Sequence, residues 1–150
     1  MNKTNLMLML LVLNLLCKNA FAVTCTVNSS GFNFGSFNVL TGDSVDSNST
    51  ITVSCDASVS YTIALSQGNS GIFSTRKMMS GSNILEYNLY TEATYQTIWG
   101  NDIGGSVIVL GSTSNTLPTN HTVYGRIPLN TQRGVVSGNY SDNITITVTY

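Results

Sequence analysis

The residues that could perform nucleophilic catalysis are a serine in a tight turn and a single histidine. The motif Gly-Asn-Ser-Gly at residues 68–71 places a serine between glycines, as some hydrolases do with their nucleophile. The reaction needs a histidine base, which lies before the serine in trypsin-like enzymes. Here His121, the one histidine of the chain, follows the motif. We therefore expect an ordinary turn at 68–71 and assign no catalytic residue.

Metal binding is the second chemistry that the residue types could support. Asp43 and Asp46 lie in a polar stretch, but their spacing does not match a calcium loop of the form D-x-D-x-D-G, and no bidentate glutamate follows. One histidine and three cysteines do not supply a set of transition-metal ligands. We expect no metal site and no cofactor.

The N-terminal residues have the composition of a cleaved export signal. Residues 1–22 combine a positive Lys3, an apolar run at residues 6–16 and a small-residue site at Ala20-Phe21-Ala22. The run is shorter than the roughly 20 residues that cross a bilayer. We therefore expect export in soluble form, without membrane insertion, and one domain at residues 23–150 after cleavage.

Cleavage would leave two cysteines in the exported chain. Cys17 would leave with the signal, and Cys25 and Cys55 would remain. In an oxidising compartment the plain expectation is one disulfide between them. A lipid anchor on Cys17 is the alternative, and the bulky Leu16 before it disfavours that modification.

The charge of the chain excludes two classes of partner. Six Lys and Arg residues stand against seven Asp and Glu residues, and charged residues make up 9% of the sequence. Nucleic acids and anionic membrane surfaces bind clustered basic residues, which this sequence does not offer. We expect neither partner.

Short alternating segments separated by Gly, Asn, Asp and Ser predict an all-β sandwich or barrel. The polar stretch at residues 41–49 is expected to be a loop, and no linker divides the chain into two domains. The expected strands are Thr24–Val27, Thr50–Cys55, Tyr61–Ser66, Ile84–Thr91, Thr94–Trp99, Val107–Leu110, Thr122–Leu129 and Ile144–Tyr150.

The aromatic residues allow two interpretations. They could line a sugar-binding face, but aromatics in a small β domain more often belong to the core and its rim. We favour the core for this set, which comprises Tyr87, Tyr90, Trp99, Tyr124 and Tyr140.

The most regular strand pattern is the last one in the sequence. Ile144, Ile146, Val148 and Tyr150 alternate with three threonines, which is the period of a half-buried strand. A final strand with an apolar face raises the question of what covers its outer edge.

Several stretches together resemble the spore coat protein U domain, a family that includes subunits of archaic, Csu-type chaperone–usher pili. The resemblance covers nearly all of residues 23–150 in order, and only the combination is specific. It consists of C-x-V at Cys25, FNFGSF at Phe32–Phe37, ITVSC at Ile51–Cys55, RKM at Arg76–Met78, LEYNLYTEATYQTIWG at Leu85–Gly100, YGRIP at Tyr124–Pro128 and GNYSDNITITVTY at Gly138–Tyr150.

The resemblance implies an immunoglobulin-like β-sandwich that lacks its final strand. In pili of this kind a periplasmic chaperone first lends a strand to the gap. The N-terminal extension of a neighbouring subunit replaces that strand during assembly at an outer-membrane usher. The chaperone, the usher and the donor strand of a neighbouring subunit are the partners that the resemblance implies.

The family's functional parts carry over to residues that match its pattern. Cys25 and Cys55 would join the first strand to the second. Ile144, Ile146, Val148 and Tyr150 would form one wall of the strand-acceptor groove, and the carboxylate of Tyr150 would be the group that a chaperone grips. Phe32, Phe34 and Phe37 belong either to this groove or to the ordinary core.

One departure from the family's pattern concerns the start of the exported chain. Shaft subunits carry a donor segment before the first cysteine, but cleavage after Ala22 would leave only Val23 and Thr24 there. Two residues cannot span a groove that needs a strand of about five. We therefore expect a subunit that accepts a strand and cannot donate one, placed either at the end of a fibre, as a tip subunit, or outside a fibre altogether.

We accordingly expect a non-enzymatic structural subunit of a surface pilus that passes through the periplasm to the cell surface. The alternative is a freestanding secreted spore-coat or carbohydrate-binding β-sandwich that closes its own edges.

Overall fold

The computed structural model describes residues 22–38, 43–114, 117–128, 132 and 134–150. The expected export signal lies outside these residues except for Ala22. No helix in the described part is long and apolar enough to cross a membrane. The regular elements of this part are β1 (Cys25–Ser29), β2 (Val45–Cys55), β3 (Val59–Leu65), the 3₁₀ turn η1 (Gly68–Ser70), β4 (Arg76–Ser80), β5 (Asn83–Tyr90), β6 (Val109–Thr113), β7 (Thr119–Ile127) and β8 (Ile146–Thr149).

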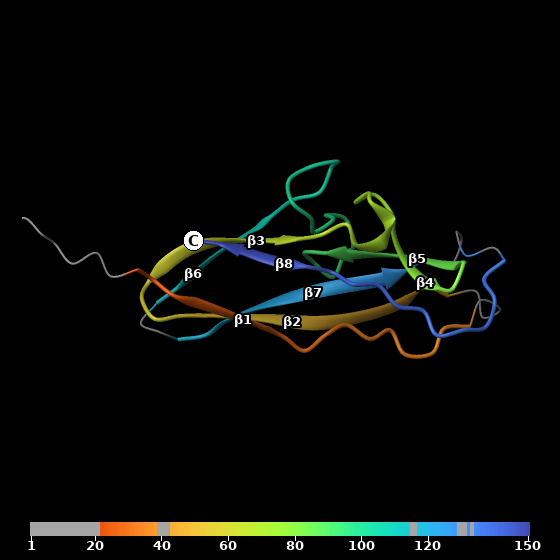
Figure 1. The fold of residues 1–150 in the computed structure, drawn as a ribbon, viewed down its shortest axis with the longest axis horizontal. Coiled ribbons are helices and arrows are strands. Elements are labelled where there is room, and N and C mark those ends of the chain that lie inside the picture. Colours follow the sequence, from red (N-terminus) through yellow and green to blue (C-terminus); the bar gives the residue numbers. More distant parts are fainter. Residues whose placement is uncertain (1–21, 39–42, 115–116, 129–131, 133) are drawn as a thin grey trace, which may run out of the picture.

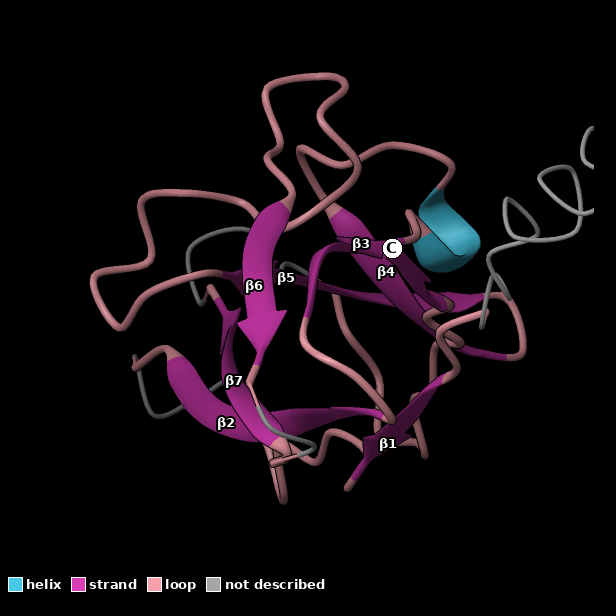
Figure 2. Ribbon diagram, turned by 90° about the vertical axis from the view of Figure 1, so that its left-hand side faces the viewer, coloured by secondary structure: helices cyan, strands magenta, loops and turns pink. Residues whose placement is uncertain are grey.

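These strands form two antiparallel sheets that face each other. The larger sheet has the order β1-β2-β7-β5-β4 and the smaller one β6-β3-β8. Figure 1 shows β3 and β8 lying above β1, β2 and β7, and Figure 2 shows the same two layers from the side. The predicted all-β sandwich is confirmed.

The core lies between the sheets and follows the alternation in the sequence. Alternation along the expected strands places Ile51, Val53 and Cys55 on one face, and these residues are buried on β2. Alternate residues of β3 and β5 are buried in the same way. Trp99 is 1% exposed, and its indole N–H donates a 3.0 Å hydrogen bond to the carbonyl of Ile63. A buried Trp N–H needs such an acceptor, so this bond ties the loop that carries Trp99 to the centre of β3.

The expected strand at Thr94–Trp99 is wrong. Only isolated bridges occur at its end, Tyr90 with Ile98 and Trp99 with Val107. The carboxylate of Glu92 accepts the backbone N–H groups of Gln96 and Thr97 at 2.8 and 2.6 Å. The side chain thereby takes the backbone donors that a neighbouring strand would need, so the segment folds into a turn.

Two further differences concern β2 and β4. The expected loop at residues 41–49 is wrong from Val45 onward, because Val45 pairs with Ile127 and β2 extends along all of β7. Residues 41 and 42 lie outside the described part of the chain. The strand β4 was not expected, and it forms a hairpin with β5 through a two-residue turn in which Gly81 has φ of 60°.

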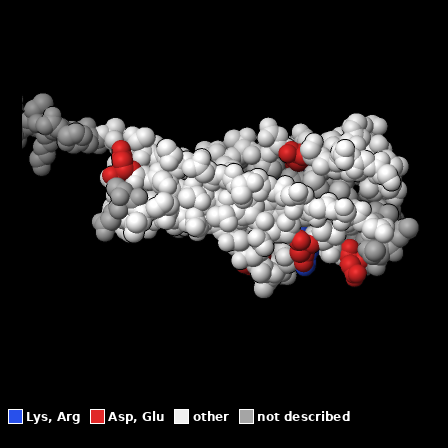
Figure 3. Space-filling view, turned by 90° about the horizontal axis from the view of Figure 1, so that it is seen from below, with Lys and Arg blue, Asp and Glu red and all other residues white. Residues whose placement is uncertain are grey.

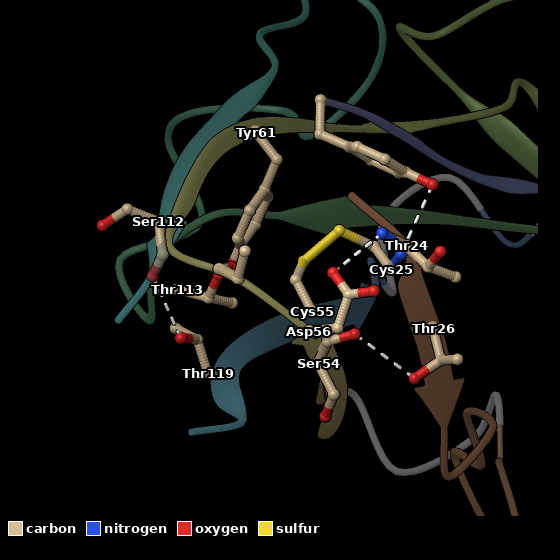
Figure 4. Close-up of a disulfide and its surroundings, with 12 residues drawn as sticks. Thr24, Cys25, Thr26, Ser54, Cys55, Asp56, Tyr61, Ser112, Thr113 and Thr119 are labelled. Carbon is tan, nitrogen blue, oxygen red and sulfur yellow. Dashed lines mark hydrogen bonds between the residues drawn. A yellow bond between two sulfur atoms is a disulfide. The ribbon is translucent and has the colours of Figure 1, made fainter. Parts of the chain in front are cut away.

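The expected disulfide is confirmed. Cys25 and Cys55 are directly paired residues of β1 and β2, and they are bonded through their sulfurs (Figure 4). Thr24 and Asp56 continue this contact, because the Asp56 carboxylate accepts the Thr24 N–H at 2.9 Å. The two cysteines are 30 residues apart in the sequence. In the loop-entropy model, the cross-link stabilises the folded state by roughly 3–4 kcal/mol because it lowers the entropy of the unfolded chain.

The outer surface of the described residues is poor in charge. Figure 3 shows the face on the β1 and β2 side with scattered acidic groups and one small basic area beside an acidic one. The single ion pair of the described residues joins Arg126 and Asp46 at 2.6 Å across β7 and β2. The guanidinium of Arg126 also stacks on Tyr95 at 3.8 Å from the ring centre. Arg126 therefore interacts with both an acidic and an aromatic side chain.

The contact between His121 and Tyr61 predicts how stability depends on pH. The Tyr61 hydroxyl lies 2.8 Å from His121 Nε2, and burial lowers the pKa of His121 in the folded chain. The unfolded chain therefore binds a proton first as the pH falls below about 6.5. We expect the free energy of unfolding to decrease from pH 7.5 to pH 5. Urea denaturation of His121→Gln should lose part of this decrease, and an unchanged pH profile in that variant would contradict the assignment.

Candidate functional site

The site is a groove between the two sheets on the side of β8. Strand β8 ends the order β6-β3-β8, so within the described residues its outer edge has no neighbouring strand. A cavity of about 340 Å³ lies beside this edge, between residues 140–146 and residues 29–34. Its floor is apolar and comes from both sheets, with contributions from Ile51, Leu65, Leu89 and Val123.

A second cavity continues the first along the same side. It has a volume of about 690 Å³ and lies between residues 32–38 and residues 135–140, over Leu85 and Ile127. The two cavities share Phe32, Phe34, Met78 and Tyr140 as lining residues. We call the two together the C-terminal groove. Its walls are antiparallel stretches of chain, one following β1 and one leading into β8 (Figure 1).

The wall that leads into β8 is held at both sheets. Ser141 and Met79 exchange backbone hydrogen bonds of 3.0 and 2.8 Å at the edge of β4. Thr145 then contacts Ser66 at the end of β3, because the Ser66 N–H donates to the Thr145 carbonyl at 3.0 Å and the Ser66 hydroxyl accepts the Thr145 N–H at 2.9 Å. The segment therefore crosses from one sheet to the other and forms one side of the groove.

The four expected wall residues do not all lie in the groove. Ile144 and Ile146 line the cavity. Val148 packs against the core without lining either cavity, and Tyr150 is 53% exposed. The Tyr150 hydroxyl accepts a hydrogen bond of 3.3 Å from the N–H of Cys25. Tyr150 thus ties the end of the chain to β1 and lines neither cavity.

The opposite wall carries the phenylalanines whose place the sequence left open. Phe32 and Phe34 line both cavities with ring centres 4.9 Å apart, and Phe37 lines the second cavity. A side chain at Gly125 would overlap the ends of both the Phe32 and Phe34 rings, so the glycine of β7 makes room for them. The aromatic rings form part of the groove surface.

The backbone of β8 has a free side that faces the groove. Along an antiparallel strand, every second residue forms backbone hydrogen bonds to the neighbouring strand. The backbone N–H and C=O groups of the residues in between point to the opposite side. Because Thr145 bonds to Ser66, Thr147 and Thr149 are the β8 residues that exchange bonds with β3. The N–H and C=O groups of Ile146 and Val148 then point to the outer edge, where the described part of the chain supplies no strand.

A buried arginine that sequence reasoning missed supports this wall. Arg76 is 0% exposed, and its guanidinium donates to the carbonyl of Ser66 at 3.0 and 2.9 Å, to the carbonyl of Trp99 at 2.7 Å and to Asn88 Oδ1 at 2.7 Å. Burial lowers the pKa of Arg76, and the nearby Tyr87 and Asp142 oppose that change. Arg76 positions Ser66, and Ser66 in turn holds Thr145 at the start of β8.

Asp142 is the second residue that sequence reasoning missed. Its carboxylate lines the smaller cavity and accepts hydrogen bonds from the Tyr87 hydroxyl at 2.7 Å and from the backbone N–H of Asn69 at 2.8 Å. Burial, and then the hydrogen bond to Asp142, raise the pKa of Tyr87. The sequence does contain a signal for Asp142. It lies two residues before Ile144, so the strand alternation places it on the same face as Ile144 and Ile146.

The other chemical candidates do not form a site. The hydroxyl of Ser70 donates to the carbonyls of Gln67 and Ile72, and residues 68–70 form the turn η1, whereas the ring of His121 contacts Tyr61. The described residues contain no group of three or more His, Cys, Asp or Glu that could hold a metal ion. Asp46 belongs to the ion pair with Arg126, which holds the pKa of this carboxyl below its usual value.

The five aromatic candidates do not share one face. Tyr87 and Trp99 are buried in the core, at 4% and 1% exposed. Tyr140 lines the groove, and its hydroxyl donates to the carbonyl of Val136 at 2.7 Å. Tyr90 is half-buried with its ring edge-on to Tyr95, and Tyr124 is a half-buried residue of β7 directly opposite Tyr90. The interpretation as core and rim residues fits this distribution.

The geometry of the described residues defines a two-sheet β-sandwich in which an apolar groove lies beside the edge strand β8. The chain belongs to the spore coat protein U domain family, whose model matches residues 12–147. A search of the curated proteins found no relative.

Among solved structures, the fold is similar to a chain of the chaperone–tip adhesion subunit pre-assembly complex CsuC–CsuE from archaic chaperone–usher Csu pili of Acinetobacter baumannii. The TM-score is 0.61 at 18% identity, over 86% of this chain and 40% of that chain. At this identity the likeness concerns the fold, and this chain spans less than half of its neighbour.

The role of Arg76 can be tested by removing its hydrogen bonds. Arg76→Met leaves the buried carbonyls of Ser66 and Trp99 and the amide oxygen of Asn88 without their donor, and each such loss costs about 1–3 kcal/mol. We expect the free energy of unfolding in urea to fall by about 3 kcal/mol or more. The matched control is Lys77→Met, which removes a partly exposed charge from the next residue of β4. Equal effects of the two substitutions would contradict the role of Arg76.

Proposed function

We propose that this protein is an exported, non-enzymatic structural subunit of a surface pilus, assembled by a chaperone–usher system, and that its C-terminal groove accepts an extended strand from another polypeptide. The observation that carries this proposal is the free edge of β8 beside an apolar cavity between the sheets. A groove of this composition matches the chemistry of a β-strand and offers no catalytic group.

The groove has two deficits that one strand removes together. The outward N–H and C=O groups of Ile146 and Val148 need hydrogen-bond partners, and the floor at Ile51, Leu89 and Val123 needs apolar cover. An added strand forms the backbone ladder with alternate peptide groups and places every second side chain into the cavity. A small ligand would satisfy only one of these needs.

The comparisons support the identity of the occupants. The chain belongs to the spore coat protein U domain family, and its fold neighbour is part of a complex of a chaperone with a tip adhesion subunit from archaic chaperone–usher pili. In the proposed sequence of events a periplasmic chaperone occupies the groove first. A donor strand from a neighbouring subunit replaces it at the outer-membrane usher, and the protein ends in a fimbria at the cell surface.

The position in the fibre follows from the proposed cleavage after Ala22. Thr24 is already engaged with Asp56, so a chain that starts at Val23 has no free segment with which to reach another groove. Such a subunit accepts a strand without donating one, as a tip subunit does. N-terminal sequencing of the exported protein should give Val23 as the first residue, and a start well before it would remove this part of the proposal.

Strand acceptance can be tested within one molecule. We would extend the chain after Tyr150 with an Asn-Gly turn and a strand of alternating Val and Thr, which can fold back along β8. The extension should raise the unfolding midpoint in urea, because it covers the groove and pairs the free edge. Ile146→Asp should abolish this gain, since a carboxylate in the apolar groove has no partner.

The control is Thr147→Asp, which places the same charge on the exposed side of β8. This variant should keep the gain in midpoint. A strand extension that leaves the midpoint unchanged in the wild-type chain, or equal losses in Ile146→Asp and Thr147→Asp, would contradict the acceptor function.

A further inference from the structure

The inward row of the groove wall is interrupted by a charge. Tyr140, Asp142, Ile144, Ile146 and Val148 are half-buried, while the residues between them are exposed. Asp142 therefore takes an inward position in the same register as the isoleucines. A carboxylate at such a position breaks the apolar pattern of a half-buried strand, and breaks of this kind concentrate at functional positions.

The carboxylate of Asp142 is fixed but not saturated. Oδ1 accepts the N–H groups of Asn69 and Asn143, each at 2.8 Å, and Oδ2 accepts the hydroxyl of Tyr87 at 2.7 Å. A carboxylate has about four acceptor sites and three are used here, so by count one site remains on Oδ2, the oxygen that also packs against Gly68. Gly68 packs so tightly against Asp142 that any side chain there would overlap the carboxylate. Asp142 also lines the cavity, so an incoming strand passes along it.

We propose that Asp142 determines which strands the groove accepts, by selecting a side chain with an O–H or N–H donor at the position directly opposite it. This inference rests on the proposed acceptor function and adds a rule for the donor sequence. The occupant carries apolar side chains over the floor beside Ile144 and Ile146, and a hydroxyl, amide or ammonium group at the position of Asp142.

The preference for a donor side chain follows from the hydrogen bonding and solvation of Asp142 Oδ2 in the filled groove. A donor group replaces the water that Oδ2 loses when the groove is filled, and hydrogen bonds to charged acceptors are the stronger ones. An apolar side chain at this position leaves Oδ2 desolvated without a new hydrogen bond, which costs free energy. A carboxylate adds like-charge repulsion in a poorly solvated place.

The surroundings of Asp142 limit its alternatives. The buried Arg76 on β4 directs its N–H groups at Ser66, Trp99 and Asn88, so it attracts the Asp142 carboxylate through its charge without donating a hydrogen bond to it. An inward charge at a free edge also discourages pairing with purely apolar strands, which is one way in which proteins protect such edges from aggregation. Asp142 therefore favours strands that carry a donor side chain opposite it and disfavours purely apolar strands.

The test uses strand extensions after Tyr150 that differ only in the residue opposite Asp142. Directly opposite residues of an antiparallel pair share one face, so Ser, Lys, Leu or Glu at this position meets the carboxylate. We expect the Ser and Lys extensions to lower the unfolding equilibrium constant about tenfold more than the Leu or Glu extensions do. The same four residues opposite Ile146 serve as the positional control, and there Leu should be best.

A second background separates charge from shape. In Asp142→Asn the difference between the Lys and Glu extensions should shrink to about threefold or less, because the side chain keeps its size and loses its charge. A preference for Leu at both positions of the wild-type chain, or an unchanged Lys-to-Glu ratio in Asp142→Asn, would overturn the inference while leaving strand acceptance intact. If no extension stabilises the chain, the acceptor function itself fails, and the inference fails with it.

Discussion

The structure depends on one unsatisfied constraint, the free edge of β8 above an apolar floor. Buried backbone groups and apolar side chains both need partners, and an ordinary sandwich supplies them from its own strands. In the part of the chain that the structure describes, β8 pairs with β3 on one side only, while the floor made by β2, β5 and β7 extends beyond it. The free edge and the apolar floor therefore lie side by side, and both lack a partner within the described residues.

The remaining parts of the site hold this edge in place without filling it. The disulfide between Cys25 and Cys55 and the hydroxyl of Tyr150 fix one end, where β1 approaches the last strand. At the other end Arg76 orients Ser66, which bonds to the chain just before β8. Both walls are therefore positioned before a strand arrives, and prior order of this kind lowers the entropic cost of binding.

Much of the fold could be predicted because burial acts locally along the strands. The alternations around Ile51, Ile63 and Tyr87 each predicted a strand and its inward face, and the two cysteines left after the expected signal predicted the disulfide. The segment Thr94–Trp99 has the same pattern but follows Glu92, whose carboxylate captures its backbone donors. That competition depends on the three-dimensional path of a turn, which periodicity does not contain.

The site was less accessible to sequence reasoning. Ile144 and Ile146 were found from their alternation, but the place of Tyr150 beside β1 depends on a contact with Cys25, 125 residues away. Arg76 was noticed only as part of a pattern, because its partners Ser66, Asn88 and Trp99 come from three separate segments. Asp142 was missed because the strand was recognised from its apolar positions, and a charged residue marks the point where such an apolar pattern ends.

Amide hydrogen exchange along β8 is the most direct measurement of the central claim. The edge described here predicts that the N–H of Thr147, which faces β3, exchanges slowly in the isolated chain. The N–H groups of Ile146 and Val148 should exchange rapidly, and they should become protected once an added strand occupies the groove. Slow exchange at Ile146 and Val148 in the isolated chain, equal to that of Thr147, would show that the edge is already paired and would contradict the account.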